Sequence, residues 1–96
     1  MDKVETPLVD VLRMRPMESH KLWLRFSNGE EGVRDLTDLI EKGGEMVEPL
    51  RDQTFFDRVF VEMGAPTWPN GFDLDPINLY IQLRDSHALA RATAAE

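Results

Sequence analysis

The sequence KLWLRFSNGEEGVRD, residues 21–35, decides the fold of this chain. Its first six residues alternate strictly, with leucine or phenylalanine at every second position, which is typical of a β-strand with one face on a core. Asn28-Gly29 follows, a dipeptide that type I′ turns favour because both central positions need a positive φ. These features predict a β-hairpin with a two-residue loop, in which Ser27 lies opposite Glu30.

The two-residue loop determines which side chains share a face of this hairpin. Counting back from the loop, Leu24 faces Val33 on the core side. Trp23 faces Arg34 on the outer side, where an indole and a guanidinium can stack. Trp23, Arg25 and Arg34 therefore form a candidate partner surface if the outer side meets solvent. If the sheet is covered on both sides, Trp23 belongs to the core instead.

The segments around the hairpin predict further strands and two short helices. Before it, the apolar run at residues 8–14 favours a strand, and Pro16 should end that strand because proline lacks an N–H for the ladder. After it, Asp35 and Asp52 are each placed to cap a short helix. Residues 59–62 are β-branched and aromatic, which favours another strand.

Asp75-Pro76 predicts the start of the one long helix. An aspartate caps the first turn, and a proline at the first helical position has no N–H that needs a partner. The apolar stripe expected on this helix comprises Ile77, Tyr80, Ile81, Arg84 and Ala88. We expect residues 1–85 to form a single small α+β domain, and residues 86–96, which are small and polar, to form a helical or frayed tail.

The order of these elements predicts the α+β class. Strands outnumber helices in the first two-thirds of the chain, and the long helix comes last. This order favours a small antiparallel sheet built around a β-hairpin, with short helices and a C-terminal helix packed on it.

Composition excludes several functions. The chain has 96 residues, with 11 basic and 18 acidic side chains and a formal charge of −7. That balance argues against direct nucleic-acid binding and against docking on an anionic membrane. There is no cysteine and no apolar run of about 20 residues, so we expect no thiolate metal site and no membrane span. The acidic N-terminal sequence lacks the apolar stretch of a signal peptide, which favours a cytoplasmic location.

Two polar features are candidates for chemistry. Asp73 and Asp75 could act as a general acid and base or hold a divalent cation. The alternative, which we favour, is that Asp75 caps the helix and Asp73 accepts backbone hydrogen bonds in the preceding turn. Trp68 could stack on a ligand or fill the core, and we favour the core.

No catalytic constellation is visible in the sequence. The serines have no nucleophile context, and His20 and His87 lie far apart with polar neighbours. Zinc would need three or four ligands, which these residues do not provide. The sequence therefore predicts no catalytic residues, no metal and no cofactor, and an enzyme is the less favoured interpretation.

The stretch WPNGFDLDPINLY, residues 68–80, resembles the signature of a bacterial family of short proteins, domain-of-unknown-function family 2442. The matching positions are Trp68, Pro69, Asn70, Gly71, Asp73, Leu74, Asp75, Pro76, Leu79 and Tyr80. The family's hairpin pattern is matched by Leu22, Leu24, Phe26, Asn28, Gly29, Asp35 and Leu36, and a middle segment by Pro49, Leu50, Arg51, Asp52, Phe55 and Phe56. The resemblance covers about residues 8–80. The sequence departs from the family at residues 65–67, where a usually apolar strand reads Ala-Pro-Thr, and in a longer tail after Tyr80.

The resemblance implies a small α+β fold and a genomic context rather than a reaction. Members often lie beside a gene for another short protein, in an arrangement that resembles a toxin–antitoxin pair with this family on the antitoxin side. An acidic chain also suits a basic partner, because opposite charges steer the encounter.

Three functional hypotheses follow. The first is a protein-interaction module, the antitoxin-like member of a two-gene pair with a basic neighbouring-gene product as partner, using the outer side of the hairpin and the C-terminal helix. The alternative is a small-ligand or metal-binding domain centred on the Trp68–Tyr80 motif. A homodimer formed through exposed strand edges is compatible with both.

Overall fold

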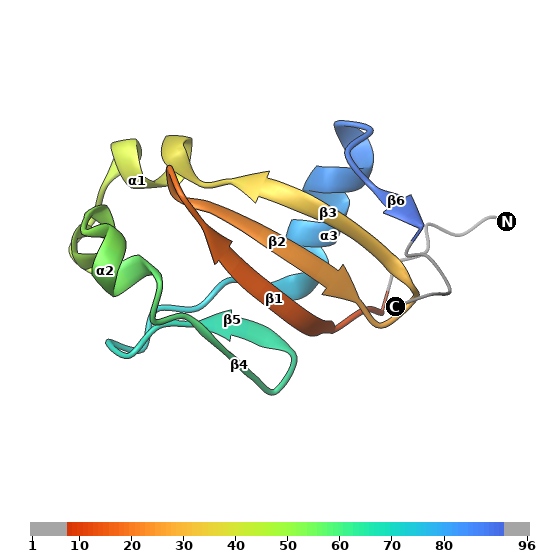
Figure 1. Ribbon diagram of the computed structural model, residues 1–96, viewed down its shortest axis with the longest axis horizontal. Helices are drawn as coiled ribbons and strands as arrows, with labels where there is room; N and C mark the ends of the chain where they lie inside the picture. Colours follow the sequence, from red (N-terminus) through yellow and green to blue (C-terminus); the bar gives the residue numbers. More distant parts are fainter. Residues whose placement is uncertain (1–7, 92–96) are drawn as a thin grey trace, which may run out of the picture.

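The computed structural model describes residues 8–91, and its central feature is a four-stranded antiparallel sheet in the order β1-β2-β3-β6 (Figure 1). The strands of this sheet are β1 (Val11–Met17), β2 (Lys21–Phe26), β3 (Glu30–Asp35) and β6 (Ala90–Arg91). A separate hairpin, β4 (Phe60–Glu62) and β5 (Ala65–Thr67), lies beside β1. The helices are α1 (Thr37–Lys42), the 3-10 helix η1 (Glu48–Arg51), α2 (Gln53–Phe56) and α3 (Pro76–Asp85). The predicted α+β class is confirmed.

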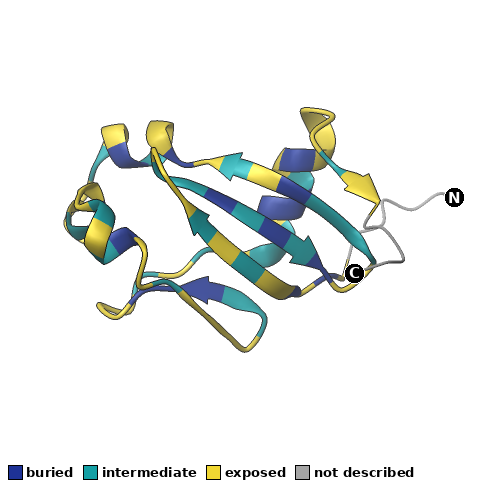
Figure 2. Cartoon of the chain, viewed as in Figure 1, coloured by how far each residue is buried: buried dark blue, intermediate teal, exposed yellow. Residues whose placement is uncertain are grey.

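The core lies between the four-stranded sheet and α3, which packs across one face of the sheet (Figure 1). Leu22, Leu24 and Phe26 of β2 are fully buried there, and the residues between them are half-buried, as Figure 2 shows along the strand. The alternation read from the sequence is therefore confirmed. The face of the sheet opposite α3 carries Trp23 and stays partly open.

The predicted hairpin is present, but its register differs by one residue from the prediction. The loop has three residues: the Gly29 N–H bonds to the Phe26 carbonyl at 3.0 Å, and Gly29 has a φ of 91°. This geometry is typical of a type I turn followed by a bulge, the usual three-residue solution. Leu24 therefore lies opposite Gly32 rather than Val33.

A one-residue slip moves every side chain of a strand to the other face. Trp23 consequently pairs with Val33, and Arg34 lies opposite Leu22 on the helix side of the sheet. The prediction that Trp23 and Arg34 share the outer face is wrong.

Both strand prolines lie inside strands. Pro16 pairs with Leu22 within β1, so the prediction that it ends the strand is wrong. Pro66 pairs with Val61 within β5, which is three residues long and includes the Ala-Pro-Thr departure from the family pattern. Each strand has an edge without a neighbouring strand of its sheet, and a proline on such an edge costs no ladder bond.

Two of the three predicted helix caps, Asp52 and Asp75, are confirmed, whereas the prediction for Asp35 is wrong by one residue, because the N-cap of α1 is Leu36, which makes no side-chain capping bond. The carboxylate of Asp52 accepts the Thr54 N–H at 3.0 Å, and that of Asp75 accepts the Ile77 N–H at 3.0 Å. Asp35 lies just ahead of α1, where hydrogen bonds from Thr37 lower the pKa of its carboxyl. In all three cases an aspartate carboxylate accepts the N–H of the residue two positions later, and such a local contact can be predicted from the sequence.

The C-terminal part of the fold differs from the prediction. The buried residues of α3 are Leu79, Tyr80 and Leu83, whereas Arg84 and Ala88 of the expected stripe are exposed. The helix ends at Asp85, and the chain then turns to pair β6 with β3 rather than continuing as a helix. Residues 92–96 of the predicted tail lie outside the described residues.

Candidate functional site

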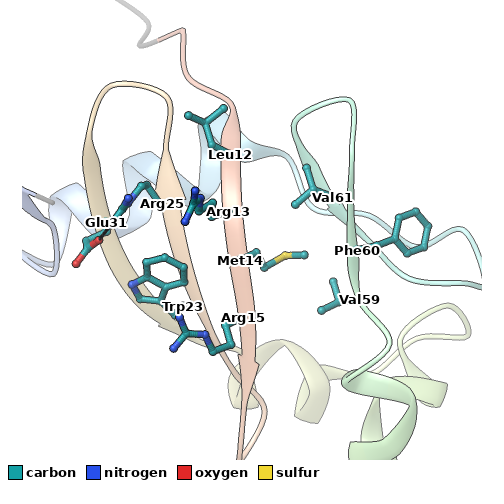
Figure 3. Close-up of a pocket in the computed structure, with 10 residues that line it drawn as sticks. All are labelled: Leu12, Arg13, Met14, Arg15, Trp23, Arg25, Glu31, Val59, Phe60 and Val61. Atoms are coloured by element: carbon teal, nitrogen blue, oxygen red, sulfur yellow. Dashed lines mark hydrogen bonds and ion pairs between the residues drawn. The ribbon is translucent and has the colours of Figure 1, made fainter. Parts of the chain in front are cut away.

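A groove of about 620 Å³ lies between the open face of the sheet and the β4 segment (Figure 3). One wall, which we call the cationic wall, consists of Arg13, Arg15, Trp23, Arg25 and Glu31. The other, the apolar wall, consists of Leu12, Met14, Val59, Phe60 and Val61. The two walls together are called the groove face below. Its volume falls in the range of sites that bind small ligands or short peptide segments.

Trp23 lies in the middle of the cationic wall. The guanidinium carbon of Arg15 is 5.0 Å from the centroid of its ring, and that of Arg25 is 5.6 Å away. Both distances are typical of cation–π contacts, so the indole is held in place by two cations. Of the two interpretations left open by the sequence, the structure supports the outward one: Trp23 is half-buried and lies on the open face.

Strand pairing explains why the arginines gather here. Alternation in β2 puts Trp23 and Arg25 on one face, and β1 places Arg15 opposite Trp23 and Arg13 opposite Arg25. A bulge between Val11 and Arg13 sets this register. Arg13 and Arg15 were not predicted to share this face, because the bulge between Val11 and Arg13 breaks the alternation of apolar and polar residues in this strand. The signal that could have found them is their spacing of two.

The charges on the groove face are unevenly compensated. The Arg25 guanidinium pairs with the Glu31 carboxylate at 3.0 Å, and both side chains are largely buried. Arg13 and Arg15 form no ion pair with any carboxylate between residues 8 and 91. Both side chains are exposed, so two positive charges face the groove without a carboxylate partner from the described part of the chain.

Arg34, the third residue of the predicted partner surface, lies elsewhere. Its Nε donates to the Gln82 Oε1 of α3 at 2.9 Å, and its Nη1 reaches an Asp38 carboxylate oxygen of α1 at 3.3 Å. This hydrogen bond lowers the pKa of the Asp38 carboxyl. Arg34 therefore links β3 to two helices on the side of the sheet opposite Trp23 and does not line the groove.

Trp68 joins the motif to the middle of the chain. Its side chain is fully buried, and its Nε1 donates to the Phe56 carbonyl at 2.9 Å. Asn70 makes a similar link, since its Nδ2 donates to the Met46 carbonyl at 3.0 Å while its Oδ1 accepts the Phe72 N–H. Pro69 and Gly71 complete a turn closed by the hydrogen bond from the Gly71 N–H to the Trp68 carbonyl.

Tyr80 joins the motif to the hairpin. Its ring packs edge-on against Phe26, with 5.3 Å between the centroids, and its hydroxyl donates to the Glu30 carboxylate. The same carboxylate accepts from Asn28 Nδ2 at 3.0 Å. Glu30 is thereby held in place by two donors that lie far apart in the sequence.

The two motif aspartates do not converge on a shared site. The Asp75 carboxylate caps α3, and Asp73 is exposed with no hydrogen bond to its carboxylate from residues 8–91. No group of three potential metal ligands occurs within that range. A cavity of about 100 Å³ near Asp75, between α1 and α3, is smaller than typical ligand sites.

Removing the Tyr80 hydroxyl tests the structural role of that residue. We expect Tyr80→Phe to lower the free energy of unfolding at pH 7 by about 1–2 kcal/mol, because a bond to a charged acceptor is lost. The hydrogen bond to Glu30 raises the pKa of Tyr80 above its ordinary value of 10.0. The stabilisation from this hydrogen bond is therefore complete below pH 10.0, and it is lost as the pH rises through the raised pKa of Tyr80 in the folded protein.

Urea unfolding at neutral and strongly alkaline pH measures this effect. The wild type should lose more stability on alkalinisation than Tyr80→Phe, so the difference between the two should shrink. A constant difference across that range would contradict the assignment.

Comparison with known proteins gives one match. Residues 11–85 match the family described as protein of unknown function (DUF2442), which spans most of the chain. The comparisons with curated proteins and with solved structures found no match. None of the helices within residues 8–91 has both the length and the apolar character needed to cross a membrane.

Proposed function

Because the chain belongs to the DUF2442 family, whose description names no activity, we propose its function from its surface: it is a protein-interaction module that binds a partner through the groove face. The observation that carries the proposal is the half-buried indole of Trp23, held between two arginines in an open groove. Tryptophan and arginine are enriched among the residues that dominate binding energies at interfaces.

The groove face also offers apolar area. Leu12 is 59% exposed and Val61 37%. Exposed apolar side chains next to a rigid aromatic anchor are typical of binding surfaces rather than of ordinary solvated ones.

A face suits this role better than a strand edge. The β1 edge carries a bulge and Pro16, and at its start the Val11 N–H bonds to the Gly64 carbonyl at 2.9 Å. The opposite edge strand, β6, is only two residues long. Bulges, prolines and short edge strands are devices that oppose edge-to-edge pairing, so the homodimer that the sequence suggested would need a different surface.

The antitoxin-like role is a variant of the interaction proposal that needs a different contact surface. Three arginines and one glutamate give the groove face a charge of +2, which leaves −9 on the rest of the chain. A basic neighbouring-gene product would therefore contact the acidic remainder rather than the surface predicted around Trp23. We also propose that the protein is located in the cytoplasm.

The small-ligand or metal-binding alternative centred on the Trp68–Tyr80 motif draws no support from the geometry of that motif. Trp68 is buried, and the polar atoms of Asn70, Asp75 and Tyr80 are occupied by contacts within the fold.

A purified partner tests the proposal. A protein captured stoichiometrically by the tagged chain would be purified and titrated calorimetrically against the wild type and Trp23→Ala. We expect at least a tenfold loss of affinity, about 1.4 kcal/mol, since the anchor of the groove face is removed.

The matched control is Arg84→Ala, on α3, away from the groove, which should bind like the wild type. Thermal melts of each variant check the fold. A partner that binds Trp23→Ala as tightly as the wild type would contradict the proposal, as would capture of no stoichiometric partner.

A further inference from the structure

We propose that the groove takes a short extended segment of the partner in which acidic residues alternate with apolar ones. This inference rests on the proposed function and adds the chemistry of the bound segment. It starts from the guanidiniums of Arg13 and Arg15, which form no ion pair with a carboxylate of residues 8–91, in a chain with a formal charge of −7. This local positive charge attracts carboxylates, which an arginine side chain can bind with two parallel hydrogen bonds.

The spacing of the two arginines selects an extended ligand. Arg13 and Arg15 are two residues apart on β1, so their attachment points are about 6.6 Å apart along the strand. Carboxylates at every second position of an extended peptide repeat at the same distance. A segment of the form Asp-x-Asp therefore presents its charges in register with this pair.

The opposite wall selects the intervening residue. An extended chain in a groove directs alternate side chains to opposite sides, so the residues between the acids face the apolar wall. Val59 and Val61 point into the groove from that wall, and Val61 is well exposed, whereas the Phe60 ring points away on the other side of β4 (Figure 3). An apolar side chain at this position would remove area from water on both partners, which favours binding.

The charge distribution favours a peptide over a nucleic acid. A single strand carries a continuous line of phosphates that would extend past the two arginines. It would then meet Glu31 and the −9 charge on the rest of the chain. A short acidic peptide carries its charges only where the cations lie.

Synthetic peptides test the inference directly. The probes are the capped peptide Asp-Phe-Asp-Val-Asp, a version with lysine at the three acidic positions and a version with serine at the two apolar positions. Trp23 fluorescence reports binding, while the fully buried Trp68 supplies a constant background. We expect the acidic–apolar peptide to bind at least tenfold more tightly than either of the others.

Charge reversal gives the sharper readout. In Arg13→Glu/Arg15→Glu, the preference between the acidic and the lysine peptide should reverse. Arg84→Glu carries a reversal of the same kind on α3 and should keep the wild-type preference. Arg13 and Arg15 are exposed and form no ion pair within residues 8–91, so their replacement should leave the fold intact, which melting curves would check.

Each other outcome overturns the inference. Equal binding of the three peptides, or no binding at millimolar concentration, would exclude an acidic–apolar segment. Tighter binding of oligothymidylate than of the acidic peptide would assign the groove to nucleic acid. If none of the peptides binds as expected but Trp23→Ala still weakens binding of the purified partner, the inference is wrong and the proposed function stands.

Discussion

A Trp68→Ala variant should be strongly destabilised, with a urea unfolding midpoint far below that of the wild type. The Trp68 side chain is fully buried, with the rings of Phe56 and Phe72 at centroid distances of 5.7 and 5.8 Å. Truncating a buried tryptophan costs about 3–5 kcal/mol through lost burial and the cavity left behind. The Phe56 carbonyl would also lose the hydrogen bond from the indole. A domain of this size has a total free energy of unfolding of only about 5–15 kcal/mol, so the loss is a large share of it.

The other tryptophan supplies the matched control. Trp23→Ala removes the same side chain from the half-buried open face and should cost about 1 kcal/mol or less. Urea unfolding followed by circular dichroism measures both variants. Trp68→Phe keeps an aromatic ring but removes the N–H donor, and its midpoint should fall between the two. Equal midpoints for Trp68→Ala and Trp23→Ala would contradict the structural assignment of Trp68.

The parts of the fold that the sequence predicted correctly depend on neighbours within a few residues. The caps at Asp52 and Asp75 and the existence of the hairpin each arise from contacts of short sequence separation. Local propensity and hydrogen bonding decide such features, so a single sequence contains the information.

The register of the hairpin was not predictable in the same way. Asn28-Gly29 fits both a two-residue loop and the last two positions of a three-residue loop, and the choice moves Arg34 from one face to the other. What decides between them is the packing of the whole sheet against α3. That packing depends on residues some 50 positions away in the sequence, such as Tyr80.

The Trp68–Tyr80 motif illustrates why a pattern of polar and aromatic residues is ambiguous. In the sequence it resembles a dense cluster that could bind a ligand. In the fold its side chains diverge: Trp68 reaches Phe56, Asn70 reaches Met46 and Tyr80 reaches Glu30. The motif therefore holds three separate segments of the chain in place through hydrogen bonds. The groove is instead formed by Arg13 and Arg15, which no motif contains.

The register of the β2–β3 hairpin also explains the second large effect, a loss of stability expected on substitution of Gly32. Gly32 lies opposite Leu24 where the sequence predicted a valine. A Cβ at this position would lie 2.8 Å from the Ala88 carbonyl oxygen and 3.3 Å from the Leu83 Cδ1. The nearer atom belongs to the backbone that follows α3 and leads into β6, so it cannot rotate away. Only a glycine allows this approach of α3 to the sheet.

Gly32→Val should therefore destabilise the protein by about 3 kcal/mol, at the upper end of the usual cost of overpacking. Valine favours strands, so intrinsic propensity would act in the opposite direction and any loss must come from the displaced segment after α3. Gly44→Ala is the matched control, because Gly44 has a φ of 124° but no atom within 4 Å of the added carbon. Gly44→Ala should therefore show the cost of backbone strain alone.

Amide exchange separates the two variants. Gly32→Val should accelerate exchange where β6 pairs with β3, at Glu31 and Ala90, and Gly44→Ala should not. Unchanged protection at this pairing in Gly32→Val would show that the close approach does not hold the C-terminal strand on the sheet.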